Sequence, residues 1–82
     1  MNMNSVPEEW DFHTRIDKVR KWKGIRQDEL ARYVGVRRET ISRIEHGTSG
    51  SISVVLAMKI ARALGTTVEE LFFFGSEEND GK

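Results

Sequence analysis

The segment 37–43 (RRETISR) brings together side chains that can hydrogen-bond to the exposed edges of base pairs. An arginine can donate two hydrogen bonds to guanine O6 and N7, a glutamate can accept one from cytosine N4, and a threonine methyl can contact the thymine methyl. One alternative stays open for Glu39, because an ion pair with Arg43 one helical turn away would keep both side chains within the protein. The candidate base-contacting residues are Arg38, Glu39, Thr40 and Arg43.

Charge is segregated along the chain, although the net charge of the 82 residues is zero. Residues 14–48 contain ten Lys or Arg and five Asp or Glu, a balance of +5. The first 13 residues contain three acids and no base, and residues 69–82 contain five acids and one lysine. A basic centre between acidic ends is typical of a protein that turns one face toward a polyanion. The alternative, that the charges only solvate helices, does not account for the segregation.

Two short helices are predicted to position the candidate base-contacting side chains. Their ranges are 27–34 and 38–45, and Gly35 lies between them, where a left-handed residue suits the turn. In the second helix Ile41 and Ile44 are spaced to face the interior, which leaves the polar residues on the outer surface. Such a helix fits the major groove, with its N-terminal residues nearest the bases.

Three further helices complete the predicted fold. They are expected at 14–23, at 54–64 after an N-cap at Ser53, and from Thr67, whose capping box precedes the apolar run that ends at Phe74. The only β-like patch is 71–74, so the fold class is predicted to be all-α. The chain is divided into an N-terminal arm, 1–12; a helix-turn-helix DNA-binding domain, 13–74; and a disordered acidic tail, 75–82.

Composition and spacing argue against several other classes of protein. The chain has no cysteine, which excludes a disulfide framework, and its two histidines lack the spacing of metal ligands. No apolar run approaches the roughly 18 residues of a membrane span, and the N-terminus lacks the cationic and apolar regions of a signal peptide. There is no Ser/His/Asp order or phosphate-binding loop. We therefore expect a cytoplasmic protein that is not an enzyme and has no cofactor or metal.

Residues 27–45 (QDELARYVGVRRETISRIE) resemble the Cro/CI-type, or XRE-type, helix-turn-helix family of phage-repressor-like regulators. Downstream, LAMKIARALGTTVEELF is similar to the family's fourth and fifth helices, so that the resemblance covers residues 15–72. It implies a five-helix lambda-repressor-like DNA-binding domain. The matching residues include Gln27, Glu29, Leu30, Ala31, Val34, Gly35, Val36, the run from Thr40 to Glu45, and Gly47.

The resemblance also implies roles for residues outside 38–43. In the family the residue matching Gln27 binds a DNA phosphate, and the pair matching Arg20 and Glu45 forms a partly buried ion pair between the first and third helices. The family usually has Ser or Thr where this chain has Arg26 and Arg37, so that two caps worth about 1 kcal/mol each are lost while two cations are placed near phosphates. The expected phosphate-contacting residues are Gln27, Arg26, Arg37, Ser42 and Thr48.

The apolar C-terminal run predicts self-association. A short helix cannot direct every apolar side chain of this run into one core, so the surplus is expected to form a surface patch. The family often dimerises through this region, and the alternative is packing within the same monomer. The expected dimer-interface residues are Val68, Phe72, Phe73 and Phe74.

These inferences together predict a transcriptional regulator, either a repressor or an autoregulator. The chain is expected to bind double-stranded DNA as a homodimer on a palindromic or pseudo-palindromic operator. A second hypothesis is an antitoxin-like protein-interaction module that carries a DNA-binding domain.

Overall fold

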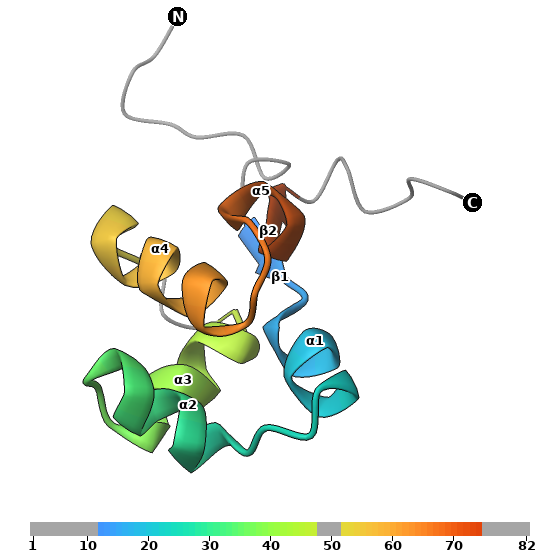
Figure 1. Cartoon of the computed structure of the whole chain (residues 1–82). Helices are drawn as coiled ribbons and strands as arrows, with labels where there is room; N and C mark the ends of the chain where they lie inside the picture. The colour runs from blue at the N-terminus through green and yellow to red at the C-terminus, as the bar shows by residue number, and fades with distance from the viewer. Residues whose placement is uncertain (1–11, 48–51, 75–82) are drawn as a thin grey trace, which may run out of the picture.

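The computed structural model describes residues 12–47 and 52–74, in which five helices and two short strands enclose one apolar core. Figure 1 shows α2 and α3 at one end of the domain and α5 with the two strands at the other. The elements in chain order are β1 (Phe12–Thr14), α1 (Ile16–Trp22), α2 (Gln27–Val34), α3 (Arg38–Glu45), α4 (Val54–Ala63), α5 (Val68–Leu71) and β2 (Phe72–Phe74).

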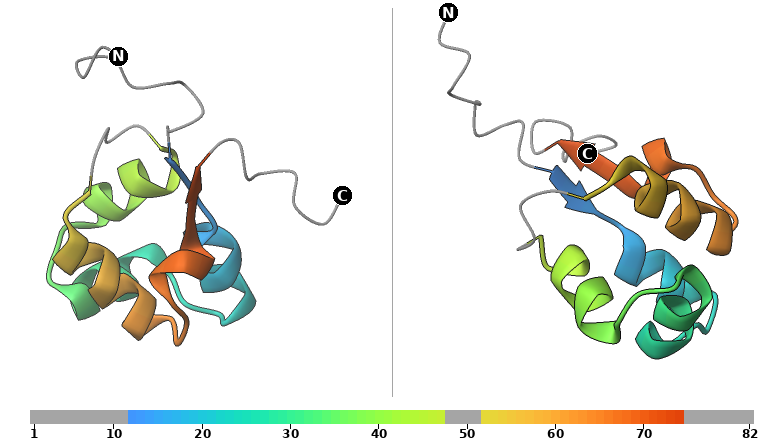
Figure 2. Two further views of the ribbon diagram at one scale, coloured as in Figure 1. Left: turned by 90° about the horizontal axis from the view of Figure 1, so that it is seen from above. Right: turned by 90° about the vertical axis from the view of Figure 1, so that its left-hand side faces the viewer.

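The strands are the one departure from the predicted all-α architecture, which is otherwise confirmed. β1 and β2 are antiparallel, with Phe12 opposite Phe74 and Thr14 opposite Phe72, and both views in Figure 2 show them side by side. The fifth helix therefore ends at Leu71, because three successive phenylalanines favour an extended chain once a partner strand is present.

The two-stranded sheet also corrects two predicted boundaries at the start of the domain. Phe12, which was assigned to the arm, and Thr14, which was assigned to the first helix, both belong to β1. The first helix begins at Ile16, where the Thr14 hydroxyl accepts a hydrogen bond from the Ile16 backbone N–H. The remainder of the predicted arm and the predicted tail lie outside the described residues.

The core fixes how α2 and α3 lie relative to the rest of the domain. Every helix contributes to it, so neither α2 nor α3 can rotate without exposing buried side chains. Each fully buried leucine or isoleucine contributes about 1.5–3 kcal/mol. The largest fully buried side chains are Ile16, Leu30, Ile41, Ile44, Ile60, Leu64 and Leu71.

The turn between α2 and α3 has the chemistry predicted for it. Gly35 lies in the left-handed region at φ 84° and ψ 31°, and its N–H donates to the Ala31 carbonyl, as does the N–H of Val36. Ala31 is buried where α2 and α3 pack together, and Val36 contacts the edge of the core. The turn therefore sets the start of α3. No helix in the described part of the chain is long and apolar enough to cross a membrane.

Candidate nucleic-acid interface

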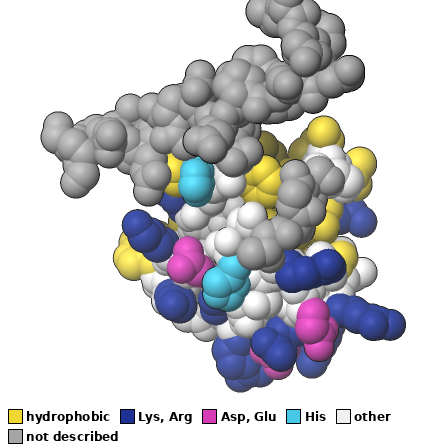
Figure 3. Space-filling model, turned by 180° about the vertical axis from the view of Figure 1, so that it is seen from behind, with side chains coloured by type: hydrophobic (Ala, Val, Ile, Leu, Met, Phe, Trp, Pro, Cys, Tyr) yellow, Lys and Arg dark blue, Asp and Glu magenta, His cyan; other side chains and the backbone are white. Residues whose placement is uncertain are grey.

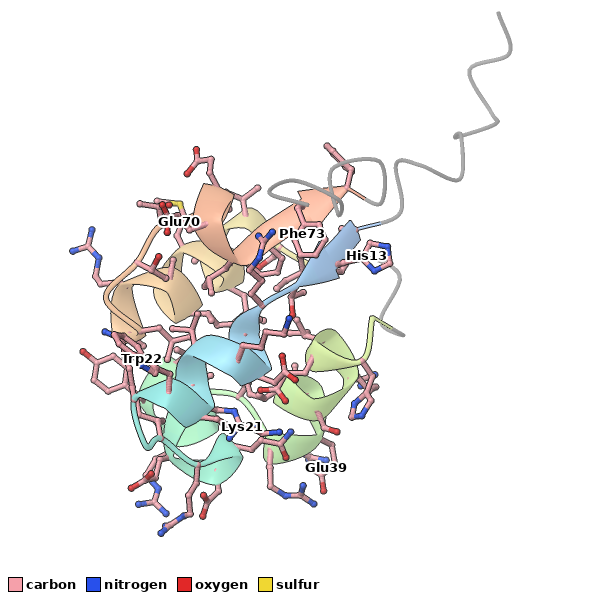
Figure 4. All side chains as sticks on the ribbon, turned by 90° about the vertical axis from the view of Figure 1, so that its right-hand side faces the viewer. His13, Lys21, Trp22, Glu39, Glu70 and Phe73 are labelled. Carbon is pink, nitrogen blue, oxygen red and sulfur yellow. The ribbon has the colours of Figure 1, made fainter. Side chains whose placement is uncertain are left out.

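The outer side of α3 carries the residues predicted to contact bases. Arg38, Glu39 and Arg43 are exposed, while Ile41 and Ile44 on the opposite side are buried. Figure 4 shows Glu39 on α3 pointing away from the body of the domain. Thr40, which was grouped with these residues, is only half-exposed. The outer surface of α3 can thus approach a ligand without any change in the core.

The helix starts that face this surface lack side-chain caps, as predicted. Arg37 precedes α3 and Arg26 precedes α2, and neither side chain accepts a hydrogen bond from its helix. At α2 the Glu29 carboxylate accepts from the Arg26 backbone N–H at 2.9 Å, which satisfies one of the unpaired groups. The N-terminus of each helix therefore lies beside an arginine, and the helix dipole and the cation both favour an anion.

Arg26 also forms an exposed ion pair that reduces its availability. Its Nε donates to Asp28 Oδ1 at 3.1 Å, and the two side chains are 71% and 47% exposed. The hydrogen bond from Arg26 lowers the pKa of Asp28 below its ordinary value, and the same bond raises the pKa of Arg26. Because exposed pairs contribute little, a phosphate can compete with Asp28 for this guanidinium.

Arg20 and Glu45 form the buried ion pair that the resemblance implies. Arg20 Nε donates to Glu45 Oε2 at 2.8 Å and Arg20 Nη2 donates to Oε1 at 3.2 Å, and the side chains are only 9% and 5% exposed. Arg20 Nη1 donates to the Ile25 carbonyl at 3.0 Å, so all three guanidinium nitrogens are bonded. The pair joins α1 to the end of α3 and lies too deep to contact DNA.

Gln27 is placed differently from the simple phosphate contact expected of it. Its Nε2 donates to Glu45 Oε1 at 2.9 Å, and its Oε1 accepts from Arg38 Nη1 at 3.2 Å. One of the two N–H bonds of the amide remains for a phosphate. Sequence reasoning missed this bridging role, because the spacing of these residues along the chain does not indicate that their side chains meet.

The structure gives less support to two other predicted phosphate contacts, Ser42 and Thr48. Ser42 is half-buried on α3, and its carbonyl oxygen lies 2.7 Å from the His46 ring Nδ1. Thr48 lies outside the described residues. Among the residues that are described, no group of three or more histidines or acids is arranged to bind a metal.

The two ends of the domain differ in surface chemistry. On the face drawn in Figure 3, most of the visible Lys and Arg side chains lie in the lower half, and the visible apolar side chains lie mostly in the upper half. At the upper end a groove of about 530 Å³ lies between α4, α5 and the strands. Its lining is Phe12, Ile52, Val54, Ala57, Val68, Glu69, Phe72, Phe73 and Phe74, which includes all four residues predicted to form a dimer interface.

Not all of the aromatic run is available to a partner. Phe72 contacts Phe12 edge-to-face with ring centroids 6.0 Å apart, and Phe73 is stacked on His13 with ring centroids 5.6 Å apart. Figure 4 shows His13 and Phe73 next to each other on the two strands. The Arg15 guanidinium lies 4.1 Å from the centre of the Phe73 ring. Part of the run thus packs within the monomer, the alternative considered for it. The side chain of Phe74 is 47% exposed.

A helix-turn-helix family model matches residues 16–71, which span α1 to α5. The chain belongs to the Cro/CI-type helix-turn-helix family. An Archaeoglobus fulgidus member of the family, named as an HTH-type transcriptional regulator, is 49% identical over 71 residues, which are 87% of this chain and 100% of the relative.

Two solved structures of regulatory proteins share the fold. The restriction-modification controller protein C.AhdI from Aeromonas hydrophila superposes with a TM-score of 0.64 at 32% identity, covering 68% of this chain and 83% of that one. The clp gene regulator ClgR from Corynebacterium glutamicum gives a TM-score of 0.62 at 30% identity, covering 66% of this chain and 56% of ClgR. The Cro/CI-type helices are therefore shared with proteins named as regulators.

Proposed function

We propose that this chain is a DNA-binding transcriptional regulator that inserts α3 into the major groove and represses transcription from the sites it occupies. The observation that carries the proposal is the outer surface of α3, where Arg38, Glu39 and Arg43 are exposed. The opposite side of the helix is buried in the core and holds it in place. Arginine and glutamate at the start of such a helix can distinguish guanine and cytosine by hydrogen bonds. Family membership, with relatives named as transcriptional regulators, supports the proposal.

Phosphate contacts would supply most of the affinity. Arg37 and Arg26 lie at the starts of α3 and α2, and Gln27 keeps one donor beside them. Contacts of this kind position the protein on the duplex without selecting a sequence, and they make binding weaken as salt rises. In this proposal the protein carries out no catalysis, and because its ligand is double-stranded DNA we expect it in the cytoplasm.

We also propose a homodimer that joins through the apolar end of the domain. The groove there lies away from α3, and two of the apolar side chains that line it are largely exposed, Val54 at 73% and Phe74 at 47%. Contiguous apolar surface of this kind favours association. A two-fold dimer would present two α3 helices to half-sites about 34 Å apart on one side of the duplex. In the antitoxin-like alternative a different protein would occupy the same groove.

Selection of bound sequences from random duplexes, using the full chain, tests the proposal. The expected result is a motif with two inverted half-sites whose centres are about one helical turn apart, with guanine or cytosine at the positions that contact α3. Recovery of unselected sequences, with binding that depends on salt alone, would contradict it. A single half-site would retain the α3 contact but exclude the symmetric dimer.

A further inference from the structure

We infer that the buried Arg20–Glu45 pair positions the base-contacting arginine, with Gln27 as the connecting residue. Gln27 donates to Glu45 and accepts from Arg38, so a chain of hydrogen bonds runs from the interior to the exposed surface of α3. The inference rests on the proposed function, because it concerns the contact between Arg38 and a base. It assigns Glu45 and Gln27 as positioning residues that determine specificity without touching a base.

The bonding capacities of the groups permit only one orientation of the Gln27 amide. The Glu45 carboxylate can only accept hydrogen bonds, and the Arg38 guanidinium can only donate them. Rotating the amide by half a turn would place oxygen against oxygen at 2.9 Å and nitrogen against nitrogen at 3.2 Å. Glu45 therefore directs Nε2 inward and leaves Oε1 to accept from the residue at position 38. That residue must be a donor, as arginine is.

Glu45 is well suited to act as a fixed reference point. Its side chain is 5% exposed, and its two oxygens receive three hydrogen bonds, two of them from Arg20. Arg20 is in turn bonded to the Ile25 carbonyl. Neither side chain can change its rotamer without leaving a buried charge unpaired, which is strongly unfavourable. Glu45 therefore holds the Gln27 amide in one orientation.

The result is an exposed arginine that is partly ordered before DNA arrives. Arg38 uses Nη1 to bind Gln27, and the edge formed by Nε and Nη2 remains available for guanine O6 and N7. A long side chain that is already ordered loses less conformational entropy on binding. Loss of this ordering is expected to reduce discrimination at the base that contacts Arg38 by about two- to tenfold.

A double replacement tests the inference without leaving a buried charge. In Arg20→Met/Glu45→Leu both charges are exchanged for apolar side chains of similar volume, a change that buried ion pairs often tolerate. Circular dichroism reports the fold, and titration of the selected duplex and its single-base variants reports the affinity ratio at each position. We expect the ratio at the Arg38 position to fall by about two- to tenfold, while the ratios at other positions stay the same.

A second variant and a control make the outcome decisive. Gln27→Leu keeps the ion pair but removes the link, so it is expected to lower the same ratio, and combining it with the double replacement should lower that ratio no further. Ile60→Val weakens the core through α4 without removing any group of the Glu45–Gln27–Arg38 link, and it should leave every ratio unchanged. Should the double replacement fail to fold, Gln27→Leu alone supplies the test.

The outcomes separate this inference from the proposed function. If Arg38→Ala removes base preference at one position but the folded double variant and Gln27→Leu both keep it, the positioning role is wrong and base contact by Arg38 stands. If Arg38→Ala changes no base preference at all, the proposed contact itself is wrong. A loss of preference in Gln27→Leu that is equal at every position would also overturn the inference.

Discussion

Removing one member of the buried ion pair is predicted to be the most damaging single change to a charged residue in the described part of the chain. In Glu45→Ala the Arg20 guanidinium keeps its bond to the Ile25 carbonyl but loses both bonds to the carboxylate. The two side chains are 9% and 5% exposed, so water cannot replace the lost partner. Breaking a pair at this depth costs about 3–5 kcal/mol.

This cost converts into a large shift in thermal stability. In a domain of 60–100 residues, 1 kcal/mol corresponds to roughly 4–8 °C, so the midpoint should fall by at least about 12 °C. The measurement is thermal and urea denaturation of the full chain, monitored by far-ultraviolet circular dichroism. Trp22 is 83% exposed and would be a poor fluorescent reporter of the core.

The exposed pair on α2 provides the control. Asp28→Ala removes a carboxylate from an arginine in the same way, but those side chains are 71% and 47% exposed and its effect on the midpoint should be much smaller. If the two variants changed the midpoint equally, the argument from burial would be refuted. It would also be refuted if Glu45→Ala left the midpoint unchanged.

Four further predictions address other parts of the account. Arg38→Ala should change base preference at one position in each half-site, measured by repeating the duplex selection; equal weakening at all positions would make Arg38 a phosphate contact. Phe74→Asp should yield monomers in sedimentation equilibrium, and an unchanged mass would exclude the proposed dimer surface. Arg26→Met should raise the pKa of Asp28 toward its ordinary value, measured by NMR titration, and no change would contradict the assigned cause. Because that pKa is lowered in the folded protein, the stabilising contribution of the pair is present above the ordinary value of 3.8 and is lost as pH falls through the lowered one. Gly35→Ala should cost roughly 1–2 kcal/mol in urea denaturation through the left-handed conformation alone, since no atom lies within 4 Å of the added Cβ, and unchanged stability would contradict that.

Local sequence patterns were sufficient to predict the helix-turn-helix itself. The observed bounds of α2 and α3 match the predicted ranges, because apolar spacing and the glycine at position 35 act over a few residues. The two-stranded sheet was not predicted, since it pairs Phe12 with Phe74 from opposite ends of the domain. Each strand is only three residues long, too short to show an alternating pattern.

In the candidate interface, too, features set by local sequence could be predicted, whereas features set by packing between helices could not. Exposure of Arg38 and Glu39 follows from helical periodicity, which fixes the direction of side chains around α3. The Arg20–Glu45 pair was expected only through the family resemblance. The link from Glu45 through Gln27 to Arg38 depends on how α2 packs against α3, and no spacing along one helix encodes it.

Methylation interference on the selected duplex tests most directly whether α3 lies in the major groove. Dimethyl sulfate methylates guanine at N7 in the major groove and adenine at N3 in the minor groove, so the two grooves are tested in one experiment. We predict that N7 methylation at one or more guanines in each half-site abolishes binding, in two clusters about one helical turn apart. Interference confined to adenine N3, or none at any purine, would contradict the account.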